Sequence, residues 1–327
     1  MDLPPPADSV LVVSFGGPEG PDDVLPFLEH VVAGRGVPRA RLEQVARQYD
    51  RFGGRSPIND QNRTLVAALE DVLDLPVSWG NRHWHPFLAE ALGRLAADGR
   101  RHALAFCTSA YAGPSSCRAY RVAVAEAQAE VGPGAPLVTK LPHYWDHPGF
   151  LDPLADGLAA ALADLPPGSA VAFSAHSVPA AQAEAPQVGG GYVAQLAEAS
   201  RRVAERVGAV RHDLVFQSRS GPPHQAWLGP DVNDHLRALA AGGVPGVAVC
   251  PIGFTSDHME VLYDLDTQAK ATAAEVGLAY RRSPTAGTDP RFVALVADLV
   301  AAERATPTGP DRAAACRPGC CTSAGGH

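Results

Sequence analysis

Short apolar runs alternate along this chain with stretches of helical periodicity, and this alternation restricts the possible folds more than any other feature. The runs Ser9–Phe15, His102–Cys107, Ala170–Ser174 and Val244–Cys250 are nearly continuously apolar, which is typical of strands buried on both faces of a parallel sheet. Helical patterns lie between such runs. The sequence therefore predicts an α/β fold built from doubly wound parallel sheets.

The two halves of the chain share local features. A strand leads into a proline-containing turn at Phe15–Pro18 and again at Ala175–Pro179. We therefore expect two similar Rossmann-like domains, each a parallel sheet flanked by helices, with a cleft between them. The expected boundaries are 7–140 and 141–289 for the two domains, 290–305 for a helix that packs back on the first domain, and 306–327 for a cysteine-containing tail.

Composition excludes several classes of protein. The chain has 327 residues and a net charge of -8, which argues against a general nucleic-acid binder. No apolar run approaches the roughly 20 residues of a membrane span, and the N-terminus does not resemble a signal peptide. We expect a cytoplasmic monomer with no membrane span. The cysteines at 316, 320 and 321 crowd the carboxyl end, which in a reducing compartment indicates metal or iron–sulfur ligation.

The stretch Val249–Asp266 combines a strand end with a helix start. Asp257 is a suitable N-cap, and Glu260, Asp264 and Gln268 follow one turn apart, so they line one face of the helix. Such a row of oxygen ligands could bind or move a divalent cation. The alternative is a capping box, in which Glu260 only reaches back to the amide of Asp257.

Several chemically active side chains follow predicted strands. Phe15, Tyr111, His176 and the segment 258–260 all fall where ligands bind in parallel sheets, beyond the carboxyl ends of the strands. The ordinary pKa of about 6.5 makes His176 a candidate proton acceptor. A purely structural histidine is the alternative.

Five motifs resemble those of the ferrochelatase family, in the family's order, between about Val10 and Val300. They are Val12–Pro18 (VVSFGGP), Gly53–Pro57 (GGRSP), Ser174–Pro179 (SAHSVP), Trp227–Val232 (WLGPDV) and Gly253–Asp264 (GFTSDHMEVLYD). The resemblance implies a lyase of haem biosynthesis that inserts Fe²⁺ into a porphyrin, releasing two pyrrole protons.

The same resemblance implies roles for individual residues. His176 matches the family's catalytic histidine and would accept a pyrrole proton, while Glu260, the catalytic glutamate, would handle iron or protons from the opposite side of the ring. Both are candidate metal ligands. Asp264 matches a carboxylate path for metal that leads outward, and Gln268 stands where some members have an acidic residue.

Other residues match the porphyrin-binding regions of the family. Phe15, Arg35 and Ser56 are expected to bind porphyrin, with the nearby Arg55 as a further candidate. Tyr111 aligns with a cleft-wall position, so we expect it to bind porphyrin and to ligate the iron of the product through its phenolate oxygen.

One branch of the family carries a [2Fe–2S] cluster, and the cysteines of this chain resemble its ligand pattern. The resemblance implies ligation by Cys117 together with Cys316, Cys320 and Cys321; a zinc site or a disulfide is the alternative. Cys107 and Cys250 are expected to pack in buried strands.

The resemblance to soluble members with this cluster implies coproporphyrin III as the substrate and coprohaem as the product. Protoporphyrin IX is an alternative substrate. A cobalt or sirohydrochlorin chelatase, and a non-catalytic haem or iron–sulfur binding protein on the same scaffold, are alternative functions. The presence of both His176 and Glu260 argues against the non-catalytic protein.

Overall fold

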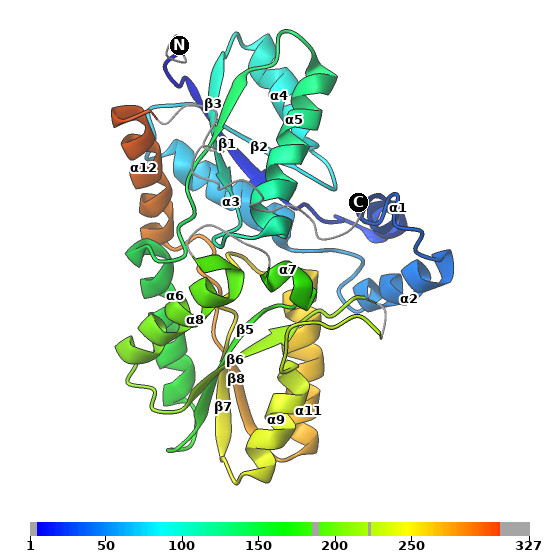
Figure 1. Cartoon of the computed structure of the whole chain (residues 1–327), viewed down its shortest axis with the longest axis vertical. Coiled ribbons are helices and arrows are strands. Elements are labelled where there is room, and N and C mark those ends of the chain that lie inside the picture. Colours follow the sequence, from blue (N-terminus) through cyan, green and yellow to red (C-terminus); the bar gives the residue numbers. More distant parts are fainter. Residues whose placement is uncertain (1–4, 185–189, 222–223, 308–327) are drawn as a thin grey trace. The chain divides into compact units, whose positions relative to one another are not determined.

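The computed structural model describes residues 5–184, 190–221 and 224–307. Within them the chain forms two compact units, each with its own four-stranded parallel sheet (Figure 1). The described part of the first unit is 5–109, 114–143 and 293–307, and that of the second is 110–113, 144–184, 190–221 and 224–292. The predicted α/β class, with two similar parallel sheets flanked by helices, is confirmed.

The sheet of the first unit has the strand order β2-β1-β3-β4. Its strands are β1 (Ser9–Ser14), β2 (Val77–Asn81), β3 (His102–Cys107) and β4 (Leu137–Lys140). Every residue of β1 and β3 is buried, as their continuous apolar sequences predict.

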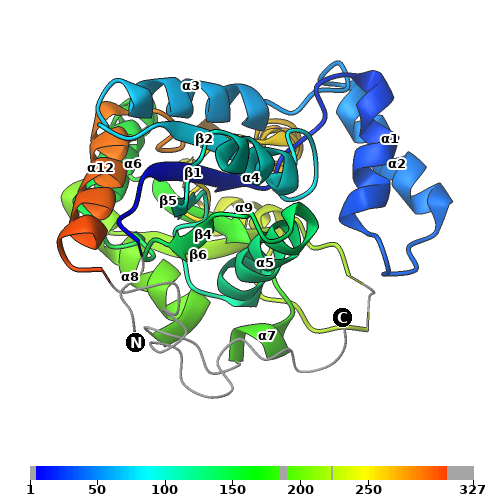
Figure 2. The ribbon, with the colours of Figure 1, turned by 90° about the horizontal axis from the view of Figure 1, so that it is seen from above.

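The helices of the first unit mostly connect these strands. They are α1 (Pro21–Val31), α2 (Arg39–Asp50), α3 (Ile58–Glu70), α4 (Leu88–Ala97), the short π-helix η1 (Pro114–Arg118), α5 (Ala119–Val131) and, from Val293 onwards, α12 (Pro290–Ala305). In both views α4 and α5 lie side by side (Figures 1 and 2), and their apolar residues share a core with β1 and β3.

The second sheet repeats this topology with the order β6-β5-β7-β8. Its strands are β5 (Ala170–His176), β6 (His212–Gln217), β7 (Gly246–Cys250) and β8 (Ala279–Arg282). Sequence analysis did not identify β8, because this four-residue edge strand is polar and lacks a buried apolar run. In each sheet the chain winds first to one side of the earliest strand and then to the other, so that β5 and β7 flank the switch point of the second sheet.

The helices of the second unit cover its sheet and carry the residues of interest. They are α6 (Pro148–Ala163), α7 (Ala180–Glu184), α8 (Gly191–Arg206), α9 (Val232–Ala241), α10 (Met259–Val261), the π-helix η3 (Leu262–Ala269) and α11 (Lys270–Glu275). Figure 1 shows α9 and α11 side by side. The last three elements follow one another without a break.

The continuous helix α10–η3–α11 buries residues that repeat every four positions. Val261, Leu265, Ala269 and Ala273 are all fully buried against β7 and its neighbours. In an ordinary α-helix of 3.6 residues per turn a four-residue repeat drifts around the axis, whereas the wider turn of a π-helix reduces the drift. The π-helix therefore lets one face stay in the core while the adjacent face carries Glu260 and Asp264.

Candidate active site

His176 is the last residue of β5, and its imidazole emerges at the carboxyl edge of the second sheet. The side chain is 36% exposed, although every preceding residue of the strand is buried. Its Nδ1 lies 2.6 Å from the carbonyl oxygen of Ser177, so Nδ1 carries the hydrogen of that bond. The other ring nitrogen, Nε2, is therefore the atom that is available to exchange a proton.

Glu260 reaches the same edge from the turn after β7. The backbone of Gly253 packs against β5, where a Cβ would lie 2.6 Å from the Cβ of Ala175 and 2.7 Å from its Cα. Only glycine permits this approach. The amide of Gly253 donates to the carbonyl of Ser174 at 3.1 Å, which ties the turn to the end of the neighbouring strand.

The start of the helix differs from the prediction. His258, rather than Asp257, is the N-cap, and its Nδ1 accepts from the amide of Glu260 at 3.2 Å. Asp257 instead binds both terminal nitrogens of Arg282 at 3.1 Å, and the same guanidinium binds Asp266 at 2.7 Å. The predicted N-cap and the alternative capping box are both wrong, because a partly buried arginine on β8 binds the Asp257 carboxylate and the Glu260 side chain turns towards His176.

His176 and Glu260 are neighbours within one unit. Nε2 of His176 lies 3.5 Å from Oε2 of Glu260. The expectation that they stand on opposite sides of a macrocycle is therefore wrong, because a flat ring between two groups needs two contact distances, or about 7 Å. Both side chains belong to the same wall of any binding site.

This proximity shifts the protonation of both groups. Burial lowers the pKa of His176, but the hydrogen bond and the charge of Glu260 outweigh it, so the pKa ends above 6.5. For Glu260 burial raises the pKa, and the opposing effects of His176 and His258 bring it down to about 2. The stabilisation from this ion pair is lost as the pH rises through the raised pKa of His176, or falls towards that of Glu260.

Asp264 lies one turn beyond Glu260. Burial and, to a smaller extent, the charge of Glu260 raise the pKa of Asp264 to about 6, against the opposing effect of hydrogen bonds from Ser218 and Gln217. Gln268, the next position in the predicted row, is exposed. No group of three or more histidine, cysteine or acidic side chains in the described part of the chain is arranged to hold a metal ion.

Tyr111 is not placed as an iron ligand. Its side chain is 3% exposed, and its hydroxyl donates to the carbonyl of Ile252 at 2.8 Å. Burial raises the pKa of Tyr111 well above its usual value, so the phenolate is disfavoured. Iron ligation by Tyr111 stays a prediction; in this structure the hydroxyl lies inside the second unit as a hydrogen-bond donor.

The predicted porphyrin-binding residues of the first unit differ in exposure. Phe15 follows β1, is 37% exposed and lies 4.5 Å from the His83 ring between ring centres. Arg35 is exposed after α1. Ser56 is 3% exposed, and its side chain packs against the backbone of Gly17. A Cβ added to Gly17 would lie 2.7 Å from the Cβ of Ser56. This buried position does not support direct contact between Ser56 and a ligand.

Sequence analysis missed Arg82 and His83, which directly follow β2. The guanidinium of Arg82 lies 5.0 Å above the Tyr120 ring and 6.0 Å above the Phe15 ring. Among the described residues nothing accepts a hydrogen bond from the buried Nε of Arg82, and Nδ1 of His83 also lacks a partner. Burial lowers the pKa of Arg82, and it lowers that of His83 to about 3, with further lowering by Arg82.

The sequence feature that could have identified these two residues as site candidates is their position directly after a strand. β2 ends at Asn81. Arg82 and His83 therefore occupy the same kind of position as Phe15, which directly follows β1.

The cysteines separate into two groups. Cys107 and Cys250 are buried in β3 and β7 as predicted, and burial raises their pKa values to about 11 and 12. Cys117 is 7% exposed in η1, with its Sγ 2.9 Å from Nε2 of His143. Residues 316, 320 and 321 lie outside the described residues.

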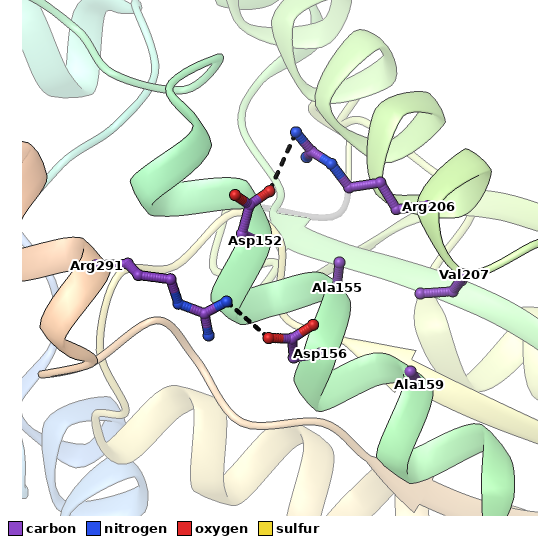
Figure 3. Close-up of a pocket in the computed structure, with 7 residues that line it drawn as sticks. All are labelled: Asp152, Ala155, Asp156, Ala159, Arg206, Val207 and Arg291. Atoms are coloured by element: carbon purple, nitrogen blue, oxygen red, sulfur yellow. Dashed lines mark hydrogen bonds and ion pairs between the residues drawn. The ribbon is translucent and has the colours of Figure 1, made fainter.

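A surface cavity of about 330 Å³ in the second unit contains none of the predicted site residues. Figure 3 shows its two arginines pointing at two aspartates: Arg206 pairs with Asp152 at 3.1 Å, and Arg291 pairs with Asp156 at 2.7 Å. Because these charges neutralise each other, we assign no ligand to this cavity.

In the described part of the chain, no helix combines the length and the apolar character needed to cross a membrane.

The chain resembles SirB from Bacillus subtilis, solved with Fe³⁺, at a TM-score of 0.58 over 92% of this chain and 98% of that one; with 8% identity, this likeness concerns the fold. The ferrochelatase family pattern matches residues 7–304, and the chain belongs to the ferrochelatase family.

Two curated relatives are much more similar in sequence. The coproporphyrin III ferrochelatase of Streptomyces griseus is 51% identical, over 94% of this chain and 88% of the relative. The enzyme of the same name from Mycobacterium avium is 49% identical, over 98% of this chain and 95% of the relative.

The contact between His176 and Glu260 predicts a specific titration. In Glu260→Gln the pKa of His176 should fall, because the opposing charge is lost while burial remains. NMR titration of the imidazole Cε1 proton measures this value. Glu275→Gln, which changes an exposed glutamate at the end of α11, should leave it unaltered. An unchanged His176 pKa in Glu260→Gln would contradict the pairing.

Proposed function

We propose that this ferrochelatase inserts Fe²⁺ into coproporphyrin III to give coprohaem, in haem biosynthesis. The observation that carries the proposal is the 3.5 Å contact between His176 and Glu260 at the carboxyl edge of the second sheet. The substrate is inferred from relatives about 50% identical over most of the chain, which are named coproporphyrin III ferrochelatases. Their reaction class is metal chelation by a lyase.

Metal insertion requires that two pyrrole protons leave for each Fe²⁺ that enters. His176 Nε2 is the candidate acceptor, because Nδ1 is engaged with the carbonyl of Ser177. Glu260 raises the pKa of His176 above its ordinary value, which strengthens the imidazole as a base. The charge of the adjacent Glu260 carboxylate stabilises the protonated imidazole, so we infer that Glu260 favours proton transfer from a pyrrole nitrogen to His176.

The same carboxylate suits the arriving iron. Glu260 stays ionised at neutral pH and is about half exposed, so it can attract and ligate a hydrated cation. Asp264, one turn further along the helix, extends the acidic surface. We infer that iron moves along these two carboxylates towards His176, and that the exposed Gln268 adds no charge to the path.

The propionate groups of the porphyrin need cationic partners. Arg82 is a candidate that sequence analysis missed, since its guanidinium is half-buried and no described carboxylate pairs with it. A buried cation without a partner is costly, and an incoming carboxylate would supply the missing charge. The exposed Arg35 and the aromatic face of Phe15 are the further predicted contacts in the same unit.

Two other functions are separable by experiment. Protoporphyrin IX has two propionates where coproporphyrin III has four, so the ratio of their kcat/KM values decides between them as substrates. A non-catalytic haem or iron–sulfur binding protein would bind porphyrin without converting it. Anaerobic absorbance spectroscopy with Fe²⁺ distinguishes insertion from binding. Insertion replaces the free-base spectrum by a metalloporphyrin spectrum, whereas binding alone does not.

Cytoplasmic location and a monomeric state stay predictions.

His176→Ala should lower the rate of iron insertion by about 10²–10⁴-fold, which is the usual contribution of a positioned proton acceptor. Coproporphyrin III should still bind, as measured by quenching of its fluorescence. His212→Ala is the matched control. This exposed histidine begins β6, at the end of the sheet opposite to the one where His176 lies. Wild-type turnover by His176→Ala would remove this residue from the mechanism.

Arg82→Met should weaken the binding of coproporphyrin III by about tenfold or more, since a charge-assisted hydrogen bond contributes about 1.5–3 kcal/mol. The rate at saturating porphyrin should change little, because Arg82 is not proposed to move protons or iron. Fluorescence titration measures the Kd. Arg94→Met, at an exposed position of α4, is the control. Equal Kd values for the two variants would contradict the assignment.

We also propose a [2Fe–2S] cluster held by Cys117, Cys316, Cys320 and Cys321. The described position is compatible with a cluster ligand: the Cys117 sulfur is buried and lies 2.9 Å from an imidazole nitrogen of His143. When bound, such a cluster supplies a one-electron redox centre and a covalent tie between segments. We route no step of iron insertion through it.

Cys117→Ser should lose most of the visible charge-transfer absorbance of the anaerobically purified protein, because the cluster would lack one of four thiolates. Iron and acid-labile sulfide analysis provides a second measurement. Ser115→Ala changes an exposed residue of the same short helix and should keep both signals. Colourless wild-type protein that contains zinc after growth with ample iron would refute the cluster.

A further inference from the structure

Ser218 has an unusual backbone conformation directly after β6. Its φ of 59° makes it the only non-glycine residue with a positive φ in the described part of the chain. Residues with a Cβ avoid this left-handed region because of steric repulsion, whereas glycine adopts it freely. Strain of this kind persists only where neighbouring interactions hold the residue, and it is frequent at functional sites.

The conformation places the Ser218 hydroxyl on Asp264. Ser218 Oγ donates to Oδ2 of Asp264 at 2.5 Å, and the Gln217 side-chain amide donates to the same oxygen at 3.2 Å. Gln217 is itself held by the Ser174 hydroxyl at 2.7 Å. These contacts connect β5 and β6 to η3 at the edge where His176 lies, since His176 and Gln217 are register partners.

Both donors bind one oxygen of the carboxylate. No described residue donates a hydrogen bond to Oδ1 of Asp264, so that oxygen stays available while Oδ2 is held. A carboxylate fixed in this way can offer a cation a single oriented oxygen, without losing side-chain freedom when the cation binds.

We propose that Ser218 is a positioning residue, which holds the Asp264 carboxylate so that Oδ1 faces iron on its way to Glu260 and His176. The inference rests on the proposed function, because it concerns the path of the metal substrate. A residue kept for folding alone would be replaced by glycine without loss, since glycine removes the steric cost at this φ. The hydroxyl therefore explains why serine stands at this position.

Two substitutions separate the hydroxyl from the backbone. Ser218→Ala removes the hydroxyl and keeps the Cβ, whereas Ser218→Gly removes the hydroxyl and relieves the steric repulsion. We expect KM for Fe²⁺ to rise about tenfold in both variants, with KM for coproporphyrin III unchanged. The Tm of Ser218→Gly should be no lower than that of Ser218→Ala. Ser220→Gly, at an exposed position of the same loop, controls for added chain flexibility.

A wild-type KM for Fe²⁺ in both Ser218 variants would overturn the proposal. So would a uniform loss of kcat and of affinity for both substrates that parallels a loss of stability. Crystal structures of the wild-type protein and of Ser218→Gly give a readout independent of turnover: the Asp264 carboxylate should rotate in the variant, and an unchanged orientation would contradict positioning. If the wild-type protein fails to insert iron, the proposed function fails, while these structures still decide the role of Ser218.

Discussion

The contact between His176 and Glu260 is the interaction on which the active site depends. An imidazole and a carboxylate 3.5 Å apart stabilise each other's charged forms, although partial burial acts against both charges. In the proposed reaction this pair joins a proton acceptor for the porphyrin to an anion that attracts iron, so we infer that both parts of metal insertion take place at one edge of one sheet.

The parallel sheet produces this contact from residues 84 positions apart in the chain. β5 and β7 are neighbours, and the tight packing of Gly253 against Ala175 brings the turn after β7 onto the end of β5. The Arg282 guanidinium then fixes the helix start by binding Asp257 and Asp266. The Arg282 side chain is only 14% exposed, so its removal would leave two partly buried carboxylates without their cation.

The first unit has a complementary electrostatic character. Arg82 lies between aromatic rings without a described carboxylate partner, and the neutral His83 beside it avoids adding a second charge. A protein tolerates such an unpaired cation where a ligand anion completes it. The second unit thus presents carboxylates at its sheet edge, and the first unit presents an arginine for which no described carboxylate is a partner.

The sequence alone determined the α/β class, the two similar sheets and the candidacy of His176 and Glu260, because apolar runs and helical periodicity are local properties and the motifs are contiguous. It could not determine that these two side chains share one wall, that Arg282 binds Asp257, or that Tyr111 is a buried donor. Each of these depends on a partner distant in the chain, and local capping or alignment patterns do not contain that partner. Only the tertiary structure, by aligning the ends of β5, β6 and β7, decided which of the candidate groups can act together.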